Sequence, residues 1–539
     1  MRLEKERLYP EALQKYLACL AKEPVHLRAL ARTAELYTRR GEYQKALTYA
    51  QKALENNMYD PEANFAYAII SRHLGDLVDA KETLGWAARS MEFRSSAYVQ
   101  LAEIALSENN HSLAVEYGRR AVDFNKYNIG GYDVQATALR KLNQAEAANK
   151  IINQVLDIDP LDHLARFEAY CLQPSRENLE AFKVPIRNEL PHENYLEMAL
   201  YYIRIGCDED AVLLLENAPE YATVYYWLAL LLKDKSPGES QAYLAKASGL
   251  SPALVFPFRE EEIPLFKWAM IQQPQDWKPK YYLGLIYSAK GRVEETQTLF
   301  EECDSADFAP FFLARGSLYR ELNPGKASAD FKKAVRMDEK NWRSRHALVD
   351  FELERGKPEK ALEDSRKAAE LFPEEVPIQI DVVKAAMSTR RYQDAAAILD
   401  KVEALPYEGA SEIQGLYAET HIQLGLESMR KGDWAQAVES LEKSKEYPER
   451  LGTGKPFDPD FRKQDYLESV CCDKLGQRDK AREALKSVFD YTLKNPDSRG
   501  PNAYFGGLAL QRLGEPERAR KILEKTALPP RDILDLIRR

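Results

Sequence analysis

The chain has 539 residues, several times the length of an ordinary domain, so several domains or a repeat array are expected in place of one compact core. Its composition, 45% hydrophobic and 30% charged with only 25 glycines, favours helices over strands and predicts an all-α fold. The formal net charge is −9, and basic residues alternate with acidic ones, so the basic surface of a nucleic-acid-binding protein is not expected.

Hydropathy and cysteine usage bear on location. No stretch approaches the ~20 apolar residues of a membrane span, and the start of the chain scatters charges where a signal peptide needs an apolar run. The six cysteines are spread along the chain and lack the spacing of a disulfide framework. We therefore expect a cytoplasmic protein with no membrane partner.

Residues 1–160 repeat with a period of 34 residues. One alanine series keeps this step throughout, and a second falls twelve residues before the last four members of the first. The series are Ala12, Ala46, Ala80, Ala114 and Ala148, and Ala34, Ala68, Ala102 and Ala136. Where two antiparallel helices cross closely, only a small side chain lets the backbones approach. Each period therefore predicts one antiparallel helix pair.

Turn residues and prolines support this register. A residue suited to the left-handed conformation that ends a helix stands between the two alanines of a unit. These turn residues are Gly41, Gly75, Asn109 and Asn143. Prolines mark the first turn of the second helix or the point where that helix should stop. They are Pro10, Pro358 and Pro516 for the starts, and Pro24, Pro160 and Pro373 for the stops.

Beyond residue 160 the period loosens and then returns. We expect an N-terminal array at 1–160, irregular aromatic-rich helical repeats at 161–275, a central array at 276–406, and C-terminal units with long inserted loops and a capping helix at 407–539. The central array keeps the 34-residue step through Ala327, Ala361 and Ala395. The last units are marked by Ala437, Ala481 and Ala519, which lie 42, 44 and 38 residues after their predecessors. Insertions in solenoids map to loops, often on a binding face.

The pattern of small residue, turn glycine, alanine, aromatic, alanine and closing proline resembles the tetratricopeptide repeat (TPR) family. RTAELYTRRGEYQKALTYAQKALE and ALVDFELERGKPEKALEDSRKAAELFP match it closely. The resemblance implies a right-handed superhelical solenoid, here with an irregular middle, whose concave face is lined by the first helix of each pair.

A second resemblance concerns context. Three segments look like the C-terminal halves of large uncharacterised bacterial proteins, in which a β-sandwich related to carbohydrate-active enzymes precedes a TPR array. They are LVDAKETLGWAARSMEFRSSAYVQLAE, FPFREEEIPLFKWAMIQQPQDWKPKYYLGLIYSAKGRVEE and GKPFDPDFRKQDYLESVCCDKLGQRDKAREAL. No such sandwich is expected within these 539 residues.

Residues that carry chemistry are sparse. The seven histidines never stand two at a metal-binding spacing, and HExxH, CxxC and GxSxG motifs are absent. LGTGKPF lacks the residues that a phosphate loop requires. Cys471 and Cys472 are expected to be buried thiols, and Asp458 and Asp460 stand in a polar loop without a predicted pocket. We expect no catalytic residue, cofactor or metal site, and therefore no enzyme.

Aromatic residues gather in the irregular middle and allow two interpretations. They are Tyr221, Tyr225, Tyr226, Trp227, Phe256, Phe258, Phe266, Trp268, Trp277, Tyr281 and Tyr282. Aromatics in helices usually fill a core, and this interpretation is favoured. The alternative is an exposed surface that binds a partner domain or a sugar.

Positions of the TPR groove, carried onto this chain, give nine candidate partner-binding residues. They are Arg28, Glu35, Arg39, Glu62, Phe65, His73, Glu103, Asp133 and Lys141. Chaperone-binding members of the family clamp a C-terminal carboxylate with Lys, Asn and Arg. The clamp positions here hold Ala31, Glu35, Phe65 and Val99. A chaperone co-factor is therefore not expected.

The resulting hypothesis is a scaffold that binds a protein or a neighbouring domain. The alternative is an accessory module of a bacterial carbohydrate-active enzyme whose catalytic β-sandwich lies outside this chain. The first helix pair is incomplete in this sequence, because only RLEKER stands before the second helix, which contains Ala12. A solenoid end normally carries a cap, so we expect residues before Met1 to complete that helix.

Overall fold

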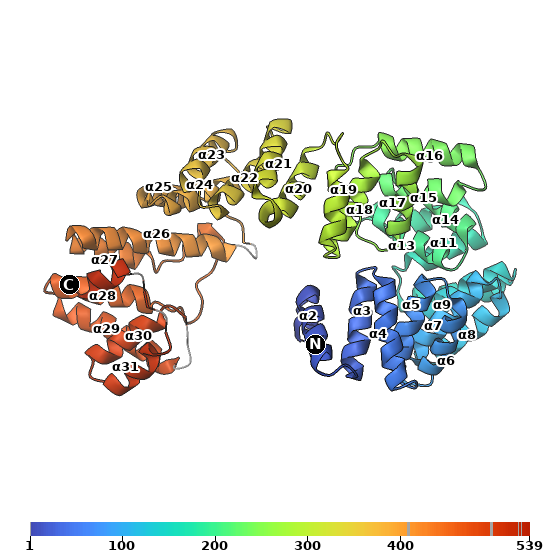
Figure 1. Cartoon of the computed structure of the whole chain (residues 1–539), viewed down its shortest axis with the longest axis horizontal. Coiled ribbons are helices and arrows are strands. Elements are labelled where there is room, and N and C mark those ends of the chain that lie inside the picture. The colour runs from blue at the N-terminus through green and yellow to red at the C-terminus, as the bar shows by residue number, and fades with distance from the viewer. Residues whose placement is uncertain (1, 407–409, 496–499, 527, 530, 539) are drawn as a thin grey trace. The chain divides into compact units, whose positions relative to one another are not determined.

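The structure is a computed structural model that describes residues 2–406, 410–495, 500–526, 528–529 and 531–538. Within these residues every regular element is a helix, so the predicted all-α fold is confirmed. The chain divides into two compact units, Met1–Ala306 and Asp307–Arg539 (Figure 1).

Unit 1 begins with successive antiparallel helix pairs. Its helices up to residue 160 are α1 (Arg2–Lys5), α2 (Tyr9–Lys22), α3 (Leu27–Arg39), α4 (Tyr43–Asn56), α5 (Pro61–His73), α6 (Leu77–Ala87), α7 (Arg94–Ser107), α8 (His111–Phe124), α9 (Ile129–Lys141) and α10 (Ala145–Ile158). From α3 onward each odd-numbered helix packs on the even-numbered helix that follows it, and α3 packs on α5, α7 on α9 and α9 on α11. The predicted pairing is confirmed.

The repeat alanines lie where these helices cross. Ala46, Ala80, Ala114 and Ala148 have no exposed surface. At the crossing of α8 and α9 even alanine is too large, because a Cβ on Gly118 would lie 2.8 Å from the backbone oxygen of Gly131. Small residues are thus required by the separation of the backbones.

The turn residues adopt the predicted conformation. Gly41 and Gly75 have φ of 67° and 82°, and Asn109 and Asn143 have φ of 58° and 57°. Each follows the first helix of a pair and reverses the chain into the second.

The irregular part of unit 1 is also helical. Its helices are α11 (His163–Leu172), α12 (Arg176–Lys183), α13 (Pro191–Arg204), α14 (Asp208–Glu216), α15 (Ala222–Leu232), α16 (Pro237–Gly249), α17 (Glu262–Gln272), α18 (Lys278–Ala289) and α19 (Val293–Glu301). Large aromatic side chains replace the small ones in its core: Phe266 lies 5.6 Å from Tyr226 and 5.4 Å from Tyr282 between ring centroids, and all three are fully buried. The core interpretation holds for most of the aromatic set. Phe256 and Phe258 are exceptions, since they are 63% and 54% exposed.

The last helices of unit 1 return to its first pairs (Figure 1). Lys290 Nζ, after α18, donates to the backbone oxygen of Arg39 at 2.9 Å. Arg40 donates to the backbone oxygen of Gly291 at 3.3 Å. Unit 1 therefore closes on itself.

Unit 2 is a second run of helix pairs. Its elements are α20 (Ala309–Leu322), α21 (Pro324–Met337), α22 (Trp342–Glu354), α23 (Pro358–Leu371), α24 (Val376–Ser388), α25 (Tyr392–Leu399), α26 (Ala410–Lys431), α27 (Trp434–Lys443), the 3₁₀ helix η1 (Glu449–Leu451), α28 (Arg462–Lys474), α29 (Arg478–Lys494), α30 (Ala503–Arg512), α31 (Pro516–Leu523) and α32 (Arg531–Arg538). The repeat residues Ala327, Ala361, Ala395 and Ala437 are fully buried.

The predicted insertions and cap lie at the end of unit 2. An irregular segment that contains η1 separates α27 from α28, and α26 is extended to 22 residues. Ile533 and Leu536 of α32 pack into the core of the last repeats, as expected for a capping helix; residues 527, 530 and 539 of the tail lie outside the described residues. Cys471 and Cys472 are buried free thiols, as predicted.

Candidate functional site

The nine predicted groove residues lie on successive first helices of unit 1. Arg28, Glu35 and Arg39 are on α3, Glu62, Phe65 and His73 on α5, Glu103 on α7, and Asp133 and Lys141 on α9. The 34-residue register thus placed them on comparable helices. Their environments differ sharply along the array.

The part of this face on α3 and α5 is polar. Arg28 and Arg39 are exposed. Arg32 forms an ion pair with Glu35 and lies 3.7 Å from Glu62, whose carboxyl pKa is raised by partial burial. Phe65 is half-buried and packs on Phe93, with ring centroids 5.3 Å apart. Charged side chains therefore surround a partly covered aromatic ring.

His73 lies where the array meets the end of unit 1. Its ring stacks on Tyr43, with centroids 4.5 Å apart, and its Nε2 is 4.0 Å from a carboxylate oxygen of Glu260. Burial lowers the pKa of the imidazole. His73 also lines a cavity of about 640 Å³ together with Arg204 and Trp227.

Glu103 connects the array to α13. Its carboxylate is 3% exposed and accepts from Arg72 of α5 at 2.7 Å and from Arg204 of α13 at 3.0 Å. Glu103 and Arg204 are 101 residues apart in the chain, and their ion pair holds α13 against the side of α7 that carries Glu103. We call this side of the array the inward face.

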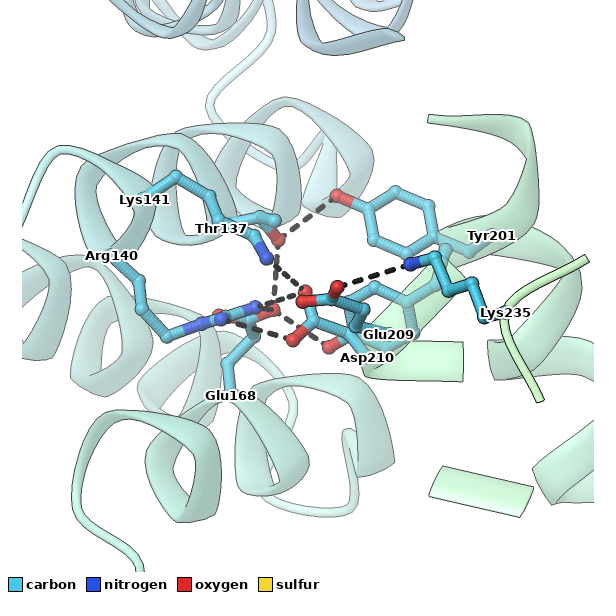
Figure 2. A network of polar contacts seen from close by, with 9 residues as sticks. Thr137, Arg140, Lys141, Glu168, Tyr201, Glu209, Asp210 and Lys235 are labelled. Atoms are coloured by element: carbon cyan, nitrogen blue, oxygen red, sulfur yellow. Dashed lines mark hydrogen bonds and ion pairs between the residues drawn. The ribbon is translucent and has the colours of Figure 1, made fainter. Parts of the chain in front are cut away.

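A second polar network joins α9 to α11 and α14 (Figure 2). Arg140 lies between two carboxylates, with its Nε 2.7 Å from Glu168 and its Nη2 3.1 Å from Asp210. Lys141 Nζ lies 2.7 Å from the same Asp210. Glu168 is only 1% exposed, so its charge depends on Arg140 for compensation.

Hydroxyl groups complete the network around Glu168. Tyr202 donates to Glu168 at 2.7 Å and Thr137 donates at 2.9 Å. The hydroxyls of Thr137 and Tyr201 are 3.2 Å apart, which links α9 to α13 directly (Figure 2). Desolvation and the neighbouring Glu168 carboxylate raise the pKa of Tyr202 well above its usual range. These buried donors therefore stay neutral and hold the helices in register.

Asp133 differs from its neighbours, because no cation pairs with it among the described residues. Burial and the nearby Asp162 carboxylate raise its pKa well above the ordinary value. It lines a pocket of about 450 Å³ between α9, the start of α11, α13 and the segment before α17. Asp162, Glu197 and Glu261 line the same pocket.

Sequence reasoning found Asp133 but not this pocket. The other carboxylates come from an inter-repeat loop, from α13 and from the run Arg259–Glu262, which share no periodic register with Asp133. The only local signal was the acidic run itself. No shared pocket was therefore predicted from the sequence for these acidic residues.

The described part of the chain offers neither a cluster of metal-binding side chains nor a helix that could span a membrane. No group of three or more His, Cys, Asp or Glu side chains there is arranged to hold a metal ion. None of the helices it contains combines the length and apolar character needed to traverse a bilayer. What the site offers is a surface of ion pairs, aromatic rings and unpaired carboxylates.

Comparisons with known proteins give one family and one curated relative. Residues 3–106 match the family described as the TT21 fifth ARM repeats domain. The TPR repeat-containing protein YpiA of Bacillus subtilis (strain 168) is 23% identical over 155 residues, which cover 28% of this chain. The match spans 36% of that relative's length.

Solved structures were also compared. The structure of Naa15/Naa10 bound to HypK-THB aligns over 100% of this chain and 95% of its own, at 15% identity and a TM-score of 0.31. YrrB, described as a TPR protein with an unusual peptide-binding site, aligns over 37% of this chain and 96% of its own, at 20% identity and a TM-score of 0.28. At these TM-scores the superpositions support no argument about function. The buried repeat register shows a helical-repeat fold, and parts of the chain are similar to an ARM repeats family and to a TPR repeat-containing protein.

Proposed function

We propose that the chain is a protein-interaction scaffold that holds a partner protein or a neighbouring domain and carries out no chemistry of its own. One observation carries this proposal: the face formed by α7 and α9 already binds two helices of the same chain, α13 and α14. Glu103 binds Arg204 at 3.0 Å, and Lys141 binds Asp210 at 2.7 Å. The face is thus built to recognise protein side chains.

The internal contacts divide the nine groove residues into two groups. His73, Glu103 and Lys141 contact residues of unit 1 itself. Arg28, Glu35, Arg39, Glu62 and Phe65 lie on α3 and α5, where Glu35 and Arg39 pair with each other and Arg28 is exposed. We assign partner contact to this second group and to Asp133, which lines the acidic pocket.

The test is photo-crosslinking in the source cells from a benzophenone amino acid at Arg28. The matched control carries the same amino acid at Val78, which is 72% exposed on the second helix α6. The scaffold proposal predicts a discrete protein adduct from Arg28 and none of the same identity from Val78. Equal, unspecific adducts from both positions would remove the support for a binding face.

The proposal includes the absence of hydrolase activity. Although carboxylates with raised pKa values line the acidic pocket, Arg204 and Arg259 line it as well, and both are engaged in ion pairs. We expect no turnover on a panel of glycosides. Turnover that disappears in Asp133→Asn would refute the non-catalytic assignment.

The alternative of an accessory module for a bacterial carbohydrate-active enzyme stays a proposal about context. It rests on the resemblance of three segments, and the described residues themselves contain helices and no strands. Reading the source gene upstream of Met1 discriminates the two: an in-frame β-sandwich supports the accessory module. We propose a cytoplasmic location, and the six free thiols support it.

A further inference from the structure

The segment between α16 and α17 has an alternating pattern that the scaffold proposal does not use. Residues 255–259 form no helix or strand. Leu254, Phe256 and Phe258 are 71%, 63% and 54% exposed, whereas Val255 and Arg259 are buried. Period-two alternation over residues 255–259 is the signature of extended backbone, so Phe256 and Phe258 point to solvent from one side, whereas Leu254 stands in the preceding turn with φ of 61°.

This apolar stripe, defined as Phe256 and Phe258, continues into the acidic pocket. Phe258 belongs to both, since it lines the pocket of about 450 Å³ beside Asp133, Asp162 and Glu261. The guanidinium of Arg259 lies 4.3 Å from the centroid of the Phe258 ring, so one face of this ring is already covered by a cation of the same chain. An apolar surface and an acidic pocket are therefore contiguous.

Carboxyl groups outnumber the arginines that line the pocket. Its two arginines are already engaged, Arg204 with Glu103 and Arg259 with Glu197. No cation pairs with Asp133, Asp162 or Glu261 within the residues that the structure describes. The pocket therefore complements a positively charged group.

We propose that the apolar stripe and the acidic pocket together bind an extended segment of a partner protein, with a Lys or Arg side chain in the pocket and apolar side chains on the stripe. The inference rests on the proposed scaffold function and names the chemistry of one partner. The partner segment is extended because its apolar side chains must match the two-residue spacing of the stripe.

A second copy of this chain fits the same surface poorly. Symmetric self-association would bring two identical acidic pockets together, and the whole chain carries a net charge of −9. Like charges at an interface oppose association, whereas a basic segment gains attraction from the same carboxylates.

The test is selection of short random peptides on the immobilised full-length chain, followed by fluorescence anisotropy of the enriched peptides. We expect enrichment of Lys or Arg next to alternating apolar residues, and affinity that weakens with added salt. Phe256→Ser and Asp133→Asn should each weaken binding by about tenfold or more. Glu209→Gln is the matched control, because this carboxylate is 82% exposed, lies outside the pocket and should leave affinity within about twofold.

Melting curves of both variants exclude misfolding as the cause, and Phe256 offers a change at an exposed position. Enriched peptides without a basic residue, no enrichment at all, or affinity unchanged in both variants would overturn the inference. So would a dimer in light scattering that Phe256→Ser abolishes. If crosslinks from Arg28 persist in any of these cases, the scaffold proposal stands while the peptide site falls.

Discussion

At the scale of single residues, Arg140 compensates the charge of the buried Glu168 carboxylate and also pairs with Asp210. Arg140→Met should destabilise the protein by about 3–5 kcal/mol, because it leaves the buried Glu168 carboxylate without its cation. Lys235→Met is the control: its ion pair with Glu209 is exposed, so the loss should stay within about 1 kcal/mol (Figure 2). Urea unfolding of both variants gives the comparison, and equal losses would contradict the role assigned to the network.

Two histidines of unit 2 should respond to pH in opposite directions. The hydrogen bond between His346 Nδ1 and Asp381, at 2.9 Å, raises the pKa of His346. Burial raises the pKa of Asp381, so the contribution of Asp381 to folding stability also falls as the pH rises. A raised histidine pKa means that the protonated imidazole is more stable in the folded chain than in the unfolded one. The resulting stabilisation of the fold is fully present below the unfolded pKa of about 6.5 and is lost as the pH rises through the folded pKa.

His421 behaves inversely, since burial lowers its pKa to about 4. The unfolded chain takes up its proton first, so this residue costs stability as the pH falls from about 6.5 toward 4. Unfolding should therefore show that His346→Gln loses more stability at pH near 6 than at pH near 8, whereas His421→Gln becomes relatively more stable on acidification. An NMR titration in which both imidazoles share one ordinary pKa would refute the assignment.

The sequence predicted residues whose role depends on size and failed for residues whose role depends on distant partners. Ala80 could be recognised because a close helix crossing demands a small side chain at a fixed spacing. Glu103 also stood in a predictable register, yet its partner Arg204 lies 101 residues away outside that register. No feature of the sequence near Glu103 indicates that it forms an internal ion pair and does not face an open groove.

At the scale of elements, the helix crossings give a direct test of the repeat register. Ala80→Arg on α6 should cost about 3 kcal/mol or more, because it forces a long, charged side chain into a site with no exposed surface. Val78→Arg on the same helix is 72% exposed and should change stability by no more than about 0.5 kcal/mol. Similar melting curves for the two variants would contradict the buried crossing.

The regular elements were predictable because turn, cap and small-residue signals coincide every 34 residues. In the middle of unit 1 these signals separate: Phe266, Tyr226 and Tyr282 fill the core without a fixed spacing. Helices could be predicted there, but which aromatic side chains face the core could not. Phe256 and Phe258 are exposed because they stand in extended backbone between helices.

At the scale of the whole molecule, the inward face of unit 1 binds helices of its own chain. The closure of unit 1 through Lys290 and Arg40, and the placement of α13 against α7 and α9, depend on contacts between distant repeats. The period of a repeat sequence predicts which helices are neighbours along the array. It does not predict contacts between repeats that are far apart in the chain. The internal occupant of the face was therefore revealed only by the structure.

A double-mutant cycle between Glu103→Gln on α7 and Arg204→Gln on α13 tests this central claim most directly. Since the two side chains form an ion pair at 3.0 Å with Glu103 only 3% exposed, we expect a coupling energy of about 1–3 kcal/mol in urea unfolding. The same cycle on the exposed pair Lys235 and Glu209 should give no more than about 0.5 kcal/mol. A coupling between Glu103 and Arg204 as small as in that control would contradict the claim that unit 1 holds its own helix on its inward face.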